Sequence, residues 1–412
     1  MRKGILTIAA TAGMLAFGLT PQASASHDSM AFKPIAGSAY GQQTAEWKEP
    51  FIAPDNCRQR LVSDETVLDI YPDGVDDLTD MNVTNESGKH AGRYLYRTHE
   101  LGTNGSVSVV DLWTGRTKIL VQDESYRRLD GLTWTPWGTL LFAEETAGGR
   151  LFEAFLDPKD PSRVTRVEVR PEVGILRHEG IGADRDGSVY VIDELNGGSI
   201  YKFVPKRRGD LSDGQLYALK LKSLTDAQQV WNEATYSDKV GSFRWVPLDM
   251  SLAVQDADAA SNAVNATEFG RPEDVQLIGN VLYVANTSED RVVAIDLKEK
   301  KLRSFVEAGV NIPAENEGDG VTGFNSPDNL AKGPDGQLWI VEDNTPSDIW
   351  VASSKTDRRG AASRVKLFAS LVDPGAESTG IYFGKDKNTL YVNIQHPDKA
   401  LADGTWAITC YG

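Results

Sequence analysis

Acidic residues recur in pairs along this chain, and the spacing within the pairs is nearly constant. Three pairs are fourteen residues apart: Asp130 and Glu144, Glu179 and Asp193, and Asp328 and Glu342. Two looser copies are Glu273 with Asn286, thirteen residues apart, and Glu377 with Asn393, sixteen residues apart. Carboxylate and amide oxygens are the ligands that Ca²⁺ takes in proteins. If the fold brings the pairs together, we expect a cation-binding centre, because so many like charges would otherwise repel one another.

The residues between the members of each pair are typical of a β-hairpin. In the copy at 129–145, an alternating apolar stretch leads into a tight turn at 136–138 and then into a second apolar stretch. A hairpin of two short strands brings its two ends together. Entry and exit acids would therefore be neighbours, and several hairpins arranged radially would gather them at one rim. The alternative is that the acids only mark solvent-exposed strand ends.

The exit positions also mark a longer repeat. They are separated by 44, 49, 93, 56 and 51 residues, at Glu100, Glu144, Asp193, Asn286, Glu342 and Asn393. Periods of about fifty residues with four strands each are typical of a β-propeller. We therefore predict an all-β fold, a six-bladed β-propeller over 61–412, with an all-β sandwich as the alternative. The double-length gap predicts a partly helical insertion between blades at about 205–265, including a short helix at 224–235.

The first 25 residues have the features of a secretory signal peptide. Arg2 and Lys3 form a charged start, an apolar run follows at 5–19, and small residues at 23–25 form a cleavage site. The run is shorter than a membrane span requires, so we predict a secreted or periplasmic protein with an extended lead-in at 26–60. The formal net charge of −16 makes nucleic acid and anionic membranes poor partners. We expect a monomer.

The cysteines and histidines narrow the chemistry further. Cys57 and Cys410 lie near opposite ends of the mature chain, which predicts a disulfide that closes the fold, with two unrelated thiols as the alternative. Five histidines in the whole chain do not fit a histidine-rich zinc site. G-x-S-x-G, H-E-x-x-H and Walker motifs are absent. Carboxylate-bound cations therefore remain the strongest chemical signal.

Four motifs resemble those of the PhoX-type alkaline phosphatases: T-P-W-G-T followed by E-E at 135–145, R-P-E-D at 271–274, S-P-D-N-L at 326–330 and V-N-I-Q-H-P at 392–397. The resemblance extends over most of the mature chain. It implies a six-bladed propeller that hydrolyses phosphate monoesters with calcium ions and a pair of irons at one end of the central channel. The metal ligands that it implies are Glu144, Glu145, Glu179, Glu273, Asp328, Glu342 and Glu377. It also implies that Arg271 contacts the phosphate.

The chain departs from the family at one implied iron ligand. Members of the family have a cysteine just before the paired glutamates, and this chain has Ala143 there. The substitution removes a soft thiolate ligand and leaves oxygen donors, which suit calcium better than iron.

The leading hypothesis is metal-assisted hydrolysis of a small-molecule phosphate ester, with Arg271 and Glu273 as the catalytic residues. Divalent cations can neutralise phosphoryl oxygens and lower the pKa of an attacking water. Arginine suits a two-pronged grip on two phosphate oxygens, although Arg271 could instead form a salt bridge with Glu273 or Glu268. Two alternatives remain: a lactonase-like calcium propeller hydrolase, and a non-catalytic calcium-binding scaffold.

Overall fold

The computed structural model describes residues 30–39, 47–71, 74–88, 90–314 and 323–411. Strands account for 48% of the chain and helices for 7%, so the prediction of an all-β fold is confirmed. The predicted signal peptide at 1–25 lies outside the described residues. Among the helices of the described part, none has the length and apolar character needed to cross a membrane.

Most strands form antiparallel units of four that are consecutive in the sequence. The first unit contains β3 (Thr79–Thr84), β4 (Tyr94–His99), β5 (Ser106–Asp111) and β6 (Arg116–Gln122). The second contains β7 (Leu129–Trp134), β8 (Leu140–Glu144), β9 (Leu151–Asp157) and β10 (Asp160–Val169). The third contains β11 (Ile181–Ala183), β12 (Val189–Ile192), β13 (Asn196–Pro205) and β14 (Gly214–Leu221).

The remaining units follow the same plan. The fourth contains β17 (Pro272–Ile278), β18 (Val281–Asn286), β19 (Arg291–Asp296) and β20 (Lys301–Glu307). The fifth contains β21 (Pro327–Lys332), β22 (Leu338–Glu342), β23 (Asp348–Ala352) and β24 (Val365–Leu371), with β1 (Phe51–Ile52) at its outer edge. The sixth contains β25 (Glu377–Phe383), β26 (Thr389–Gln395), β27 (Gly404–Cys410) and, as its outer strand, β2 (Cys57–Asp64).

Strands from near the two ends of the described chain meet in this sixth unit. β2 pairs antiparallel with β27 so that Cys57 faces Cys410, and a disulfide joins the two residues. The predicted disulfide is therefore confirmed. Part of the stretch predicted as an extended lead-in, 26–60, belongs to strands β1 and β2.

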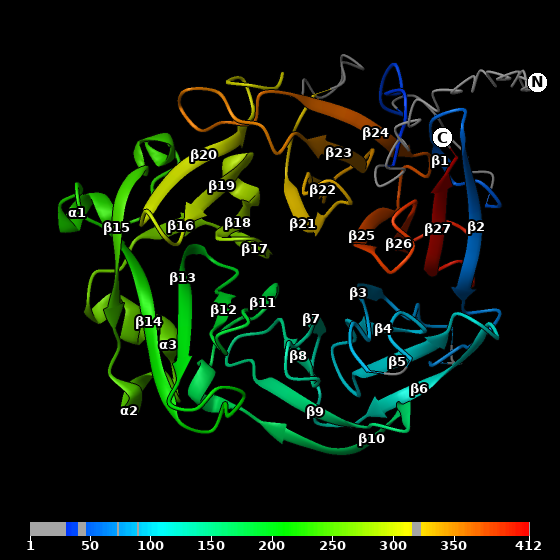
Figure 1. The fold of residues 1–412 in the computed structure, drawn as a ribbon, viewed down its shortest axis with the longest axis horizontal. Helices are drawn as coiled ribbons and strands as arrows, with labels where there is room; N and C mark the ends of the chain where they lie inside the picture. The colour runs from blue at the N-terminus through cyan, green and yellow to red at the C-terminus, as the bar shows by residue number, and fades with distance from the viewer. Residues whose placement is uncertain (1–29, 40–46, 72–73, 89, 315–322, 412) are drawn as a thin grey trace, which may run out of the picture.

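The six units follow one another around a common centre (Figure 1). The first strand of each unit faces that centre: β3, β7, β11, β17, β21 and β25. Each of these strands contacts the corresponding strand of the next unit around the ring. The starts of the six units are consequently gathered in one place.

Six hydrophobic clusters hold the ring together, one between each pair of neighbouring units. Side chains alternate between the two faces of a strand, so each unit contributes to the cluster on either side. In β8, Leu140 and Phe142 pack with the first unit, whereas Leu141 and Ala143 pack with the third. Between the first and second units, the rings of Tyr96 and Trp134 stack with their centroids 6.0 Å apart.

The segment predicted as an insertion, 205–265, is partly helical. It contains β14, α1 (Asp226–Gln229), β15 (Gly241–Pro247), α2 (Met250–Ala253) and α3 (Ala257–Ala263). β15 pairs with both β14 and β20 and thereby merges the third and fourth units into one ten-stranded sheet, in which β16 (Glu268–Gly270) lies beside β13. The helix predicted at 224–235 is shorter than expected: a capping box between Thr225 and Gln228 starts α1, and the chain turns extended at Val230.

Candidate metal centre in the central cavity

A cavity of about 220 Å³ opens at the centre of the ring. Ten carboxylates line it: Asp80, Glu100, Asp130, Glu145, Glu179, Glu194, Glu273, Asp328, Asp343 and Glu377. Arg128, Arg271 and His396 also line it, so acids greatly outnumber the basic groups. Such a concentration of acids predicts bound cations.

Six of the ten carboxylates come from the beginning of the first strand of a unit. They lie in that strand or within two residues before it: Asp80, Asp130, Glu179, Glu273, Asp328 and Glu377. Because the first strands surround the centre (Figure 1), this entry position contributes one carboxylate per unit. The predicted ligands Glu179, Glu273, Asp328 and Glu377 all belong to this set.

The other four carboxylates follow the second strand of a unit: Glu100, Glu145, Glu194 and Asp343. A repeated backbone hydrogen bond positions them. The N–H at the exit donates to the carbonyl two residues before the entry acid at 2.8–3.0 Å, in the pairs Glu100–Leu78, Glu145–Arg128, Glu194–Arg177, Thr287–Arg271 and Asp343–Ser326. In the fourth unit the exit residue is Thr287, which brings no carboxylate.

The residue that supplies this carbonyl has an unusual backbone conformation in four units. Leu78, Arg128, Arg271 and Ser326 have φ of 45°, 42°, 50° and 42°. A positive φ is uncommon for residues other than glycine and occurs where the surrounding structure enforces it, often at functional sites. The same local strain therefore recurs around the cavity, two residues before the entry acid.

Two predicted ligands do not line the cavity. Glu144 accepts hydrogen bonds from the backbone N–H groups of Arg127 and Arg150 and pairs with the Arg150 guanidinium at 2.6 Å. Glu342 accepts from the backbone N–H of Asn325 at 2.8 Å. Each of these two carboxylates anchors the segment that precedes the first strand of its own unit. The neighbouring residues Glu145 and Asp343 line the cavity instead.

Five lining carboxylates were absent from the predicted ligand set: Asp80, Glu100, Asp130, Glu194 and Asp343. The fourteen-residue spacing already identified Asp130 as an entry position, and the fifty-residue repeat identified Glu100 as an exit. Glu194 and Asp343 directly follow predicted exit acids, so an allowance of one residue would have found them. Asp80 lies before Glu100, the first position that the repeat marks, so no pair spacing identifies it.

Two groups of three carboxylates are close enough to share a cation. Ligand oxygens of Asp80, Glu100 and Asp130 lie within 4.8 Å of one another. The same holds for Glu179, Glu194 and Glu273. Both groups offer only oxygen donors, the set that Ca²⁺ prefers.

Burial favours the protonated, neutral form of these carboxyl groups, and a bound cation would favour the charged form instead. Burial raises the pKa of Glu273 to about 7, with a contribution from the Glu194 carboxylate. Burial also raises the pKa of Asp80 to about 7 and that of Glu377 to about 9, helped by Glu145 and Asp343 respectively. Asp130 Oδ1 is buried and has no hydrogen-bond partner in the described structure. Buried polar atoms are rarely left unpaired, so this oxygen fits the role of a metal ligand.

Arginines balance part of this charge. Arg271 Nε lies 2.8 Å from Glu194 Oε1 and 2.9 Å from Glu273 Oε1, and its Nη1 lies 3.7 Å from Asp343. Arg128 pairs with Glu145 at 2.6 Å and also with Glu100. Of the two predicted salt-bridge partners of Arg271, Glu273 is the one that it contacts.

The implied iron centre lacks its soft ligand. Ala143 is fully buried in the hydrophobic cluster between the second and third units and does not line the cavity. Cys57 and Cys410 are bonded to each other in the disulfide, so neither offers a thiolate ligand. The donor set therefore fits hard divalent cations rather than a thiolate-bound iron.

Solved structures of low sequence identity resemble this chain. A gluconolactonase from Xanthomonas campestris is 12% identical with a TM-score of 0.49, over 92% of this chain and 99% of its own. A streptogramin B lyase is 15% identical with a TM-score of 0.48, over 86% and 98%. A calcium-binding regucalcin from Agrobacterium tumefaciens is 13% identical with a TM-score of 0.44, over 81% and 90%. The curated proteins contain no match.

A family model gives a more specific result. The model described as alkaline phosphatase PhoX matches residues 149–398. The match spans β9 and β10 of the second unit, the third to fifth units, and β25 and β26 of the sixth, and it includes the entry acids Glu179, Glu273, Asp328 and Glu377. The chain belongs to the PhoX alkaline phosphatase family.

Proposed function

We propose that the chain is an exported, metal-dependent phosphoric ester hydrolase whose six units are the blades of a β-propeller. The observation that carries the proposal is the central cavity, which ten carboxylates and two arginines line in a member of the PhoX family. The six inter-unit clusters support the propeller interpretation, because each joins neighbouring units around the ring. We further propose calcium as the metal and a monomer as the active form.

The chain's own residues divide the work between metal binding and substrate binding. The groups Asp80–Glu100–Asp130 and Glu179–Glu194–Glu273 would hold the cations, with Asp328 and Glu377 completing the rim. Bound cations would supply positive charge to the phosphoryl oxygens and lower the pKa of an attacking water. Glu144 and Glu342 have no metal-binding role in this proposal.

Arg271 has the geometry of a phosphate-binding side chain. Glu194 and Glu273 contact its Nε, which fixes the plane of the guanidinium. The side chain remains 39% exposed beside the cavity. The terminal nitrogens can then donate to two phosphate oxygens of a small-molecule ester. Glu273 thus serves both the metal site and the orientation of Arg271.

The test is hydrolysis of p-nitrophenyl phosphate by the purified mature protein. We expect release of p-nitrophenol that a chelator abolishes and Ca²⁺ restores, and we expect the Glu273→Gln variant to lose turnover while it remains folded. The matched control is Glu168→Gln, which makes the same chemical change at an exposed strand position. Acid release from lactones without phosphate release would support the lactonase-like alternative. Calcium-dependent stability without either activity would support the scaffold.

A further inference from the structure

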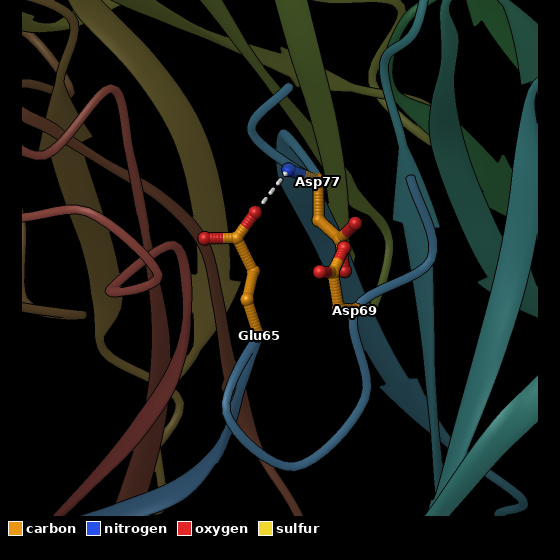
Figure 2. A group of neighbouring side chains, drawn as sticks. All are labelled: Glu65, Asp69 and Asp77. Atoms are coloured by element: carbon orange, nitrogen blue, oxygen red, sulfur yellow. Dashed lines mark hydrogen bonds between the residues drawn. The ribbon is translucent and has the colours of Figure 1, made fainter. Parts of the chain in front are cut away.

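A second group of acids lies outside the central cavity, in the loop that closes the ring. This loop leads from β2, the outer strand of the sixth unit, to β3, the inner strand of the first. It carries Glu65, Asp69 and Asp77, whose ligand oxygens lie within 4.8 Å of one another. In Figure 2 the carboxylates of Asp69 and Asp77 lie close together, and the Glu65 side chain lies beside them and reaches toward the backbone N–H of Asp77. None of the three lines the central cavity.

The loop is strongly acidic. Residues 64–80 contain seven Asp and Glu residues and no Lys or Arg. Within the described parts of the chain, no basic side chain forms an ion pair with Glu65, Asp69 or Asp77. The charge of the buried Arg97 acts on Asp77 and favours its ionised form, but the N–H groups of Arg97 donate to Ser63, Ser108 and Thr405 rather than to a carboxylate. The three acids therefore lack a direct counter-charge.

Glu65 supplies an independent sign of a missing ligand. The residue is only 5% exposed. Its Oε1 accepts the backbone N–H of Asp77 at 3.0 Å (Figure 2), but its buried Oε2 has no hydrogen-bond partner in the described structure. Leaving a buried carboxylate oxygen unpaired costs about 1–3 kcal/mol or more, so such an oxygen calls for a partner.

The backbone holds these carboxylates in place. Asp77 is 2% exposed and accepts the backbone N–H of Ile70 at 3.0 Å. Burial raises the pKa of Glu65 to about 7, with the Asp77 carboxylate adding to the shift, and burial raises the pKa of Asp77 to about 7. Asp403, whose buried Oδ2 is also unpaired, adds a further like charge nearby. A cation would relieve the repulsion among these groups.

We propose that Glu65, Asp69 and Asp77 form a second divalent-cation site, separate from the central cavity, and that its ion is calcium. The donors are all oxygens, which excludes a nitrogen- or sulfur-rich zinc site. His99 is nearby, but its Nδ1 contacts the carbonyl of Asp77 and its Nε2 contacts Ser108, so neither nitrogen is free to bind a metal. An irregular loop suits the flexible coordination of Ca²⁺ better than the strict octahedron of Mg²⁺.

The position of the loop gives the site a structural role. Leu78 directly follows Asp77, and its carbonyl accepts the N–H of Glu100. Asp80, three residues after Asp77, lines the central cavity. A cation at the loop would fix the point where the last unit meets the first. Its binding would stabilise the ring without taking part in hydrolysis.

The test counts bound calcium in the full mature protein by equilibrium dialysis followed by metal analysis. We expect Asp69→Asn, a change at a partly exposed residue, to lose one equivalent of Ca²⁺ and to reduce the rise in melting temperature that Ca²⁺ produces. Glu65→Gln should do the same. The matched control is Asp76→Asn, which removes a loop acid outside the group and should keep every equivalent.

An unchanged calcium count in both variants would overturn the proposal and would mean that the acids share protons instead. The calcium count at this loop does not depend on the proposed hydrolase activity. Glu273 lies outside the loop, so Glu273→Gln removes the activity and leaves the loop unchanged. Loss of one equivalent on Asp69→Asn in an enzymatically inactive protein would support the loop site and refute only the proposed function. Near-ultraviolet circular dichroism confirms that each variant is folded.

Discussion

At the scale of single residues, Arg271 shows how a side chain is prepared for an anionic ligand. Its backbone has a φ of 50°, its carbonyl accepts the N–H of Thr287, and Glu194 and Glu273 contact its Nε. Burial opposes its charge, but the surrounding carboxylates more than offset that effect and raise its pKa. The residue therefore remains a fixed positive charge at any working pH.

Replacing Arg271 with lysine tests the two-pronged contact. Lysine keeps the charge but cannot donate two parallel hydrogen bonds to a phosphate. Hydrogen bonds to charged groups contribute about 1.5–3 kcal/mol, so we expect kcat/KM for p-nitrophenyl phosphate to fall by about ten- to a hundred-fold. Arg166→Lys, at an exposed pair with Glu168, is the control. Unchanged kinetics for Arg271→Lys would show that this arginine acts only as a salt-bridge partner of the neighbouring carboxylates.

The adjacent residues Glu144 and Glu145 allow a second comparison. Glu144 receives backbone N–H groups and pairs with Arg150, whereas Glu145 lines the cavity. We expect Glu144→Gln to lower the free energy of unfolding by about 1–3 kcal/mol and to leave the metal content unchanged. Glu145→Gln should lower the metal content instead. Denaturant titration and metal analysis distinguish the two, and the reverse pattern would contradict the assignment.

At the scale of elements, the β-hairpin is the feature that can be predicted from the sequence. The fourteen-residue spacing predicted two strands whose ends meet, and the entry acids Glu179, Glu273 and Asp328 lie at the cavity as expected. The exit acids were displaced by one residue, from Glu144 to Glu145 and from Glu342 to Asp343. Spacing alone cannot detect this shift, because it depends on which backbone carbonyl the exit N–H reaches.

The closing pair of strands, β2 and β27, supports a prediction about stability. The disulfide between Cys57 and Cys410 spans 353 residues of sequence and ties the first described strands to the last. Removing a native disulfide typically costs about 2–5 kcal/mol. We expect the double variant Cys57→Ser with Cys410→Ser to unfold at lower denaturant concentration, as the wild type should in reducing agent. Equal midpoints for the oxidised wild type and the variant would contradict this role.

At the scale of the whole molecule, closure concentrates charge at one point. The ring gathers ten carboxylates at its centre in a chain whose formal net charge is −16. The sequence predicted the all-β fold and the acidic character. It could not predict which acids lie close enough together to hold a cation, because each group of three joins residues from different units.

The buried acids give the chelated protein a pH-dependent stability. Burial raises the pKa of Glu273, Glu194 and Asp80 to about 7, whereas such groups titrate near about 4 in an unfolded chain. Between these values the folded state holds more protons, so its stability falls as pH rises from about 4 to about 7. We expect the melting temperature of the chelated protein to drop between pH 5 and pH 8 and Ca²⁺ to restore it at the higher pH. A melting temperature that rises over this range in chelator would contradict the account.

The central claim is that cations occupy the middle of the ring, and a crystal structure grown with Ca²⁺ and phosphate tests it most directly. The account predicts one cation at Asp80, Glu100 and Asp130, another at Glu179, Glu194 and Glu273, and phosphate within hydrogen-bonding distance of the Arg271 guanidinium. A cavity that holds only water under those conditions, with its carboxyl groups hydrogen-bonded to one another, would contradict it.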